Sequence, residues 1–170
     1  MSSSIKSRIA LLGLAAAMAF NANAQNVTGA GSSFVYPVMT KWSADYRTAT
    51  KTQVNYQSIG SGGGIAQIKA ATVDFGASDA PLKPDDLAKF GLGQFPTVIG
   101  GVVPVVNIPG VAAGRIRFTG PILADLFQGK IKTWNDPAIA AVNPGLTLPA
   151  TKVTIVHRAD ASGTTFNFVN

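Results

Sequence analysis

The sequence has no cysteine, no glutamate and a single histidine, His157, in 170 residues. Without cysteine the chain cannot form a disulfide, a thiolate zinc site or a thiol nucleophile, and one histidine cannot supply a site that needs several. Acidic residues are also scarce: eight aspartates stand against fourteen lysines and arginines, for a formal net charge of +6. These basic residues are spread thinly rather than clustered as in nucleic-acid binders. Several enzyme classes and a nucleic-acid partner are therefore not expected.

The remaining composition is that of a globular protein. Hydrophobic residues make up 46% of the chain, charged residues 13%, and there are eighteen glycines. This composition is not typical of a disordered chain. The length allows one ordinary domain, or one domain and part of a second.

Residues 1–24 have the pattern of an export signal. Lys6 and Arg8 precede an apolar stretch from Ile9 to Phe20, and Ala22 and Ala24 are small residues at the positions that a signal peptidase reads. The apolar stretch is too short to span about 30 Å of hydrocarbon. We therefore expect Sec-type export to the periplasm with cleavage after Ala24, which leaves a net charge of +4.

From Val27 onward, short β-branched or apolar runs alternate with loops of Gly, Ser and Asp and with helical patterns. This alternation predicts an α/β fold with largely parallel strands. Strands are expected near residues 27–28, 54–57, 73–77 and 152–156, and helical patterns at 34–46, 65–70, 84–87, 122–127 and 137–142. In the first helical pattern Phe34, Val38, Trp42 and Tyr46 recur every four residues and predict one apolar face.

Two later segments bear on the domain organisation. Residues 95–107 read as a long extended segment, whose paired Gly100 and Gly101 indicate a crossing point between two halves. A last helix is expected to begin at Ser162 or Gly163, shortly before the sequence stops at Asn170. A compact domain does not normally finish on such a short helix, so we expect the front part of a longer protein.

Four of the predicted loops lie between a strand and a helix: residues 29–33, 58–64, 78–81 and 158–165. In a parallel sheet such loops lie at the carboxyl ends of the strands, where open α/β folds bind ligands. Helix N-termini offer unpaired N–H groups to an oxyanion, and Ser and Thr add neutral donors. Any one of these loops alone would indicate only a capped helix start.

Two charged residues in these loops refine the prediction. Arg158 lies four residues before Ser162, within reach of an anion at that helix start, although it could instead form an ion pair with Asp160. Asp79 would repel an anion unless the anion carries a proton, because an ionised carboxylate can accept an O–H bond from hydrogen phosphate but not from sulfate. The alternative for Asp79 is an N-cap of the stretch from Pro81 to Leu87.

The motifs GAGSSF, VNYQSIGSGGG, VDFGASDAPL, QFPTVIGGVVPVVNIPG, GKIKTWNDPAI and HRADASGTTF resemble the phosphate-binding protein of the bacterial phosphate ABC transporter, the PstS family. The resemblance covers about residues 27–168. It implies a two-lobed periplasmic binding protein, type II-like, that closes on one dehydrated phosphate and delivers it to a membrane permease. No cofactor, metal or catalytic residue is implied, and the full-length parent is expected to be monomeric.

The resemblance also implies a set of phosphate ligands and the roles of its members. Backbone amides would come from the first loop and the last helix start, hydroxyls from the serines, a cation from the arginine and an acceptor from the aspartate. Ser33 stands where relatives commonly have Thr, which keeps the hydroxyl and loses a methyl. The implied ligands are Ser33, Phe34, Ser61, Asp79, Arg158, Ser162, Gly163 and Thr164.

Family members run to roughly twice this length, so the resemblance implies an incomplete two-lobed fold. The signal peptide would occupy residues 1–24, the first segment of lobe one residues 25–98, and the crossing segment with a truncated start of lobe two residues 99–170. Strands without their neighbours would leave the chain poorly stable and prone to associate.

Two other functions remain open. A receptor for a different oxyanion, sulfate or molybdate, would avoid an ionised acceptor at Asp79. A secreted phosphatase-like enzyme could use the same helix starts, with His157 as a general base, but a histidine in a strand beside a cation is more often structural. Against an enzyme, the sequence offers no cluster of carboxylates to hold metal ions.

Overall fold

A computed structural model of the chain describes residues 26–170, and the predicted export signal with its cleavage site lies outside them. The described residues form two compact units: those up to Ile99 together with Asp160–Asn170, and Gly100–Ala159. The chain thus divides one residue after the expected boundary. The expected second segment, residues 99–170, does not stay together, because its last eleven residues pack with the first unit. No helix in the described part is both long and apolar enough to cross a membrane.

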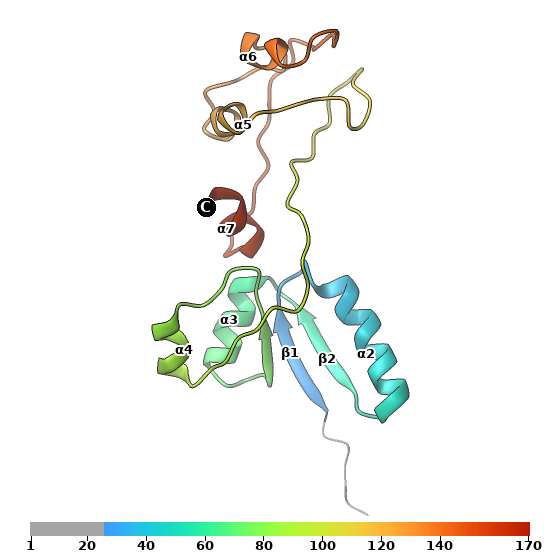
Figure 1. The fold of residues 1–170 in the computed structure, drawn as a ribbon, viewed down its shortest axis with the longest axis vertical. Coiled ribbons are helices and arrows are strands. Elements are labelled where there is room, and N and C mark those ends of the chain that lie inside the picture. Colours follow the sequence, from blue (N-terminus) through green and yellow to red (C-terminus); the bar gives the residue numbers. More distant parts are fainter. Residues whose placement is uncertain (1–25) are drawn as a thin grey trace, which may run out of the picture. The chain divides into compact units, whose positions relative to one another are not determined.

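The first unit is built on a three-stranded parallel sheet, in the order β2-β1-β3 (Figure 1). The strands are β1 (Val27–Gly31), β2 (Val54–Ser58) and β3 (Phe75–Ala77). At its last residue β1 pairs with the last residues of both neighbours, since Gly31 is in register with Ser58 and with Ala77. The loops that follow the three strands therefore leave the sheet at one common edge.

Each strand of this unit is followed by a helix, as the sequence predicted. The helices are α2 (Tyr36–Thr50), α3 (Ser61–Lys69) and α4 (Pro84–Phe90), and a further helix, α7 (Gly163–Val169), comes from the returning segment. Pro37 and Pro84 lie in first turns, where a missing N–H costs nothing. Asp85 and Asp86 lie in the first turn of α4, where negative charge is favourable.

Glycine allows α3 to lie directly against the strand ends. A Cβ added at Gly64 would lie 2.5 Å from Gly31 Cα and 2.7 Å from the Ala30 carbonyl oxygen, both backbone atoms. Gly60, just before the helix, has a φ of 82°, a left-handed conformation that a side chain would strain. The beginning of α3 is thus held at the carboxyl edge of β1.

The predicted apolar face of the first helix is only partly correct. Phe34 precedes α2, which begins at Tyr36, and α2 has no buried residue. Trp42 and Tyr46 are 43% and 48% exposed. With side chains from β1, β2 and Phe75 they line an apolar groove of about 620 Å³. We call this feature the α2 groove.

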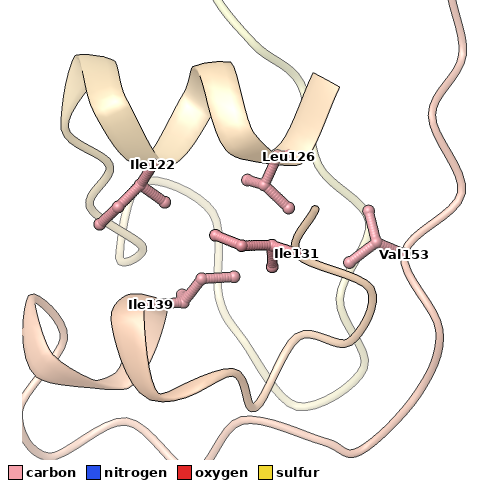
Figure 2. Close-up of a cluster of buried hydrophobic side chains, with 5 residues drawn as sticks. All are labelled: Ile122, Leu126, Ile131, Ile139 and Val153. Atoms are coloured by element: carbon pink, nitrogen blue, oxygen red, sulfur yellow. The ribbon is translucent and has the colours of Figure 1, made fainter. Parts of the chain in front are cut away.

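The second unit packs around its own small core (Figure 2). Two helices, α5 (Gly120–Phe127) and α6 (Pro137–Ala141), contribute to it. Asn143, 4% exposed, donates to the carbonyls of Arg117 and Ile139 and accepts from the Arg117 amide at 2.7 Å. The core side chains are Ile122, Leu126, Ile131, Ile139 and Val153.

The strand predicted at residues 152–156 is wrong. Only Lys152 pairs, in an isolated antiparallel bridge with Thr133, and Val153 is buried in the core cluster. A β-strand is stabilised by pairing along its length, and this segment finds one partner position among the described residues. Residues 95–107 form neither a helix nor a strand, and Val105 is 91% exposed.

Candidate functional site

The carboxyl edge of the sheet in the first unit gathers five polar or small residues, Asp79 and four others around it. Four of them, Ser61, Asp79, Gly163 and Thr164, were predicted as ligands, and the fifth, Ser32, was not. We call these five residues the Asp79 cluster. They come from the loops after β1 and β3, the first residue of α3 and the first turn of α7.

Ser32 follows β1 and is 1% exposed. Its hydroxyl donates to Asp79 Oδ1, and its Oγ accepts from the Phe34 amide at 3.0 Å. The Ser32 amide donates to the Ala77 carbonyl at 2.9 Å, and the Ser32 carbonyl accepts from the Tyr56 hydroxyl at 2.8 Å. A side chain from the middle of β2 and the carbonyl of the last residue of β3 thus hold the loop that follows β1.

Ser61 and Asp79 connect α3 to the loop after β3. Ser61 is the first residue of α3 and is 3% exposed. Its Oγ accepts from the Asp79 amide at 3.2 Å. The backbone of Asp79 is therefore fixed from α3, while its side chain faces Ser32.

The first turn of α7 closes the cluster. Thr164 Oγ1 donates to Asp79 Oδ2 at 3.2 Å, and Asn167 Nδ2 donates to the Asp79 carbonyl at 2.8 Å. Ser162 caps the helix by accepting from the Thr165 amide at 3.2 Å. A Cβ at Gly163 would overlap Ser61 Oγ and lie 2.7 Å from Asp79 Cβ, so only glycine fits there. These contacts are the reason why residues 160–170 belong to the first unit.

The structure excludes one of the two roles considered for Asp79, that of an N-cap. The N-cap of α4 is Lys83, with no side-chain cap bond, so the N-cap alternative is wrong. Each carboxylate oxygen of Asp79 accepts one hydroxyl, from Ser32 and Thr164. An ionised carboxylate has about four lone-pair sites. Asp79 therefore keeps capacity to accept a further hydrogen bond.

Tyr56 contributes to the electrostatics beside this cluster. Burial, and next the negative charge of Asp79, raise the pKa of the Tyr56 phenol from 10.0 to about 12. The phenol therefore remains protonated near neutral pH and can donate to the Ser32 carbonyl. Its ring stacks between Tyr36 and Phe75, at centroid distances of 6.3 and 5.9 Å.

The remaining predicted ligands are not part of the Asp79 cluster. Ser33 is exposed, and Phe34 is 44% exposed, with its amide bonded to Ser32. Arg158 belongs to the second unit, so its part in an anion site stays a prediction. His157 is exposed there, with Nδ1 3.0 Å from the Arg158 carbonyl oxygen. Within residues 26–170 no group of three or more His and Asp side chains is placed to hold a metal ion.

Three residues of this region were missed by the sequence reasoning: Ser32, Tyr56 and Asn167. Ser32 lies within the GAGSSF motif but beside another serine, and only the register of β1 decides which of the two is buried. Tyr56 and Asn167 act through contacts 24 and 88 residues away in sequence. Such contacts leave no local pattern.

The chain is similar to several proteins called phosphate-binding protein PstS. The protein from Xylella fastidiosa (strain Temecula1) is 65% identical over 144 residues, which are 85% of this chain and 40% of that protein. The Pasteurella multocida protein is 56% identical over 152 residues, 89% of this chain and 44% of the relative. The Haemophilus influenzae protein is 55% identical over 149 residues, 88% of this chain and 45% of the relative.

The chain thus spans less than half the length of these curated relatives. A family model described as a PBP superfamily domain matches residues 17–170. That match includes both compact units and every residue of the Asp79 cluster. Because it extends over most of the chain, and the parallel sheet agrees with it, this chain belongs to the PBP superfamily.

Proposed function

We propose that the protein to which this chain belongs captures inorganic phosphate in the periplasm and delivers it to the membrane permease of an ABC transporter. Three similar proteins carry the name phosphate-binding protein. The observation that carries the proposal is the Asp79 carboxylate, held by two hydroxyls at the carboxyl edge of the sheet. The sequence pattern of an export signal in residues 1–24 supports the periplasmic location.

Asp79 makes the site selective for an anion that carries a proton. Hydrogen phosphate can donate its O–H to a free lone pair of the carboxylate, whereas sulfate, which has no proton at neutral pH, is repelled. The other predicted ligands would supply donors to the remaining phosphate oxygens. These are the hydroxyls of Ser33, Ser61 and Ser162, the amides of Gly163 and Thr164, the guanidinium of Arg158, and the amide of Phe34, which also donates to Ser32 Oγ.

The proposed role is binding without catalysis. A phosphatase-like enzyme would need metal ligands, or a nucleophile activated by a general base with free capacity, next to the anion. The Asp79 cluster instead consists of hydroxyls and amides around one carboxylate, and both oxygens of that carboxylate already accept hydrogen bonds. A receptor for sulfate or molybdate is disfavoured by the same carboxylate.

Calorimetric titration with phosphate and with sulfate tests the proposal. The protein is used from Gln25 onward, at the full length that its gene encodes, with Asp79→Asn as the variant. We expect phosphate binding in preference to sulfate, and a phosphate-to-sulfate affinity ratio at least about tenfold smaller in Asp79→Asn, because the repulsion of sulfate is lost.

Asp74→Asn is the matched control. Asp74 is an exposed carboxylate in the same unit, bonded to the amide and hydroxyl of Thr28 at 2.7 and 2.9 Å. Its substitution should leave the ratio unchanged. Sulfate binding as tight as phosphate binding would contradict the role of Asp79. Hydrolysis of a phosphate monoester by the purified protein would instead support the enzyme alternative.

A further inference from the structure

Ser32 connects two groups that were predicted to bind phosphate. Its single hydroxyl lies between the Phe34 amide, 3.0 Å from Oγ, and the Asp79 carboxylate. An ionised carboxylate only accepts hydrogen bonds, and an amide only donates. The Ser32 O–H must therefore point to Asp79, while Oγ accepts from Phe34. The direction of both hydrogen bonds is fixed by the chemistry of the partners.

The orientation of Ser32 is fixed as well. The residue is 1% exposed, and both of its backbone polar groups are bonded, the amide to the Ala77 carbonyl and the carbonyl to the Tyr56 hydroxyl. A buried hydroxyl with a fixed backbone is a rigid donor, because few rotamers keep its bonds. Ser32 thus offers Asp79 a hydrogen bond whose direction does not change with solvent.

We propose that Ser32 is a positioning residue that sets the preference for phosphate over sulfate by fixing the Asp79 carboxylate. The inference goes one step beyond the proposed function and depends on it. Ser32 holds Oδ1 and Thr164 holds Oδ2, so the remaining lone pairs have defined directions. Without Ser32 the carboxylate can rotate, which weakens acceptance of the phosphate O–H and reduces the repulsion of sulfate.

Ser32→Ala tests this inference in the same calorimetric titration. We expect phosphate affinity to fall about tenfold, the size typical for loss of a hydrogen bond to a charged group. Sulfate affinity should change less, so the ratio of phosphate affinity to sulfate affinity should fall. In an Asp79→Ala background, Ser32→Ala should cause no further loss, because Ser32 acts through Asp79. A purely structural role would lower both affinities equally, with or without Asp79.

Two further variants complete the experiment, one as a control and one as a conservative substitution. Thr48→Ala removes an exposed hydroxyl that bonds only within α2, at 3.0 Å to the Ala44 carbonyl, and should leave both affinities unchanged. Ser32→Cys keeps nearly the same volume and replaces the hydroxyl with a weak donor, so it serves if Ser32→Ala does not fold. Ser32→Cys should also lower the phosphate-to-sulfate affinity ratio, but by a smaller factor than Ser32→Ala.

The outcomes separate the two proposals. If the unmodified protein does not bind phosphate, the proposed function and the role of Ser32 both fail. If the unmodified protein prefers phosphate and Ser32→Ala keeps the same ratio, the role of Ser32 alone is overturned. A fall in the ratio that persists in the Asp79→Ala background would also overturn it.

Discussion

Tyr56 lies beside the Asp79 cluster, bonds to one of its residues and has a raised phenol pKa. Its hydroxyl donates to the carbonyl of Ser32, 2.8 Å away and 24 residues earlier in the sequence. The ring stacks on both neighbouring aromatic residues. Because burial and the nearby Asp79 charge disfavour the phenolate, this tyrosine makes the stability of the fold sensitive to alkaline pH.

We predict that, because of Tyr56, the free energy of unfolding decreases as the pH rises from 10 to about 12. The folded state holds the phenolic proton up to a pKa of about 12, whereas the unfolded chain releases it near 10.0. The folded state binds more protons in this interval, so stability is complete below pH 10 and is lost as pH rises. Denaturant unfolding at several alkaline pH values should show a steeper decline for the natural chain than for Tyr56→Phe.

The tyrosinate absorbance gives an independent measurement. The difference between the titrations of the natural chain and Tyr56→Phe isolates the one phenol that was removed. We expect its midpoint near pH 12. A midpoint near the ordinary value of 10.0, or equal alkaline slopes of stability, would contradict the environment described for Tyr56.

At the residue scale, the sequence singled out Asp79 and some of the residues that contact it, but not Ser32. Asp79 was singled out because it is an aspartate at a strand end near other loops with the glycine and hydroxyl residues expected of an anion site, although an N-cap was an equal alternative. Ser32 could not be separated from Ser33, because both are small hydroxyl residues in one loop and only burial distinguishes them. The α4 cap considered for Asp79 proved wrong because the helix begins five residues later, at Pro84.

Among the helices, α3 depends most closely on glycine. Its first turn is Ser61-Gly62-Gly63-Gly64, and two of these glycines have different surroundings. Gly64 faces the backbone of Gly31 and Ala30, which cannot move without disturbing β1. Gly63 faces the side chain of Ile59, whose outer atoms can rotate away. Neighbouring positions of one helix therefore test whether backbone contact at the site is essential.

We predict different effects for Gly64→Ala and Gly63→Ala. Alanine favours a helix over glycine by about 1 kcal/mol, so both substitutions gain equally in propensity. At position 64 the new Cβ would overlap the backbone, at 2.5 Å from Gly31 Cα, and we expect a loss of about 2 to 3 kcal/mol. At position 63 the closest atom is Ile59 Cδ1 at 2.8 Å, and we expect little change or a small gain.

Thermal unfolding followed by circular dichroism compares the two variants. The midpoint of Gly64→Ala should lie clearly below that of the natural chain, and the midpoint of Gly63→Ala should lie close to it. Similar midpoints for the two variants would mean that α3 can move away from β1 at no cost.

At the element scale, local signals predicted helices better than strands. The proline and aspartate start of α4 and the serine cap of α7 are local, and both helices are confirmed. The segment at residues 152–156 has the composition of a strand, yet strand formation needs a partner that composition does not reveal. The parallel sheet itself was predicted, because strands and helices alternate along the chain.

At the scale of the whole molecule, the exit of the chain from the first unit has a local mark in the sequence, whereas its return has none. The exit after Ile99 coincides with paired glycines that are visible in the sequence. The return at Asp160 depends on contacts of α7 with Asp79 and of Ala161 with Gly62, both of which lie far earlier in the sequence. The two segments of the first unit therefore cooperate in the Asp79 cluster, and neither contains all of it.

The α2 groove leaves apolar side chains exposed, which affects how whole molecules associate. Trp42 and Tyr46 lie half-exposed along it, and Met39, Val54 and Phe75 line it as well. Exposed apolar surface of this kind favours association, because contact with another apolar surface removes it from water. We predict that the chain of residues 26–170 alone self-associates as its concentration rises.

Tyr46→Lys should reduce this self-association, because a lysine in the α2 groove would carry its charge into any apolar contact formed there. Val105→Lys is the control: it adds the same charge at a residue that is 91% exposed in the second unit and lies outside the groove. Sedimentation velocity over a wide concentration range measures both. Equal association in the two variants would place the contact elsewhere, and a monomer at every concentration would show that the groove is stable in water.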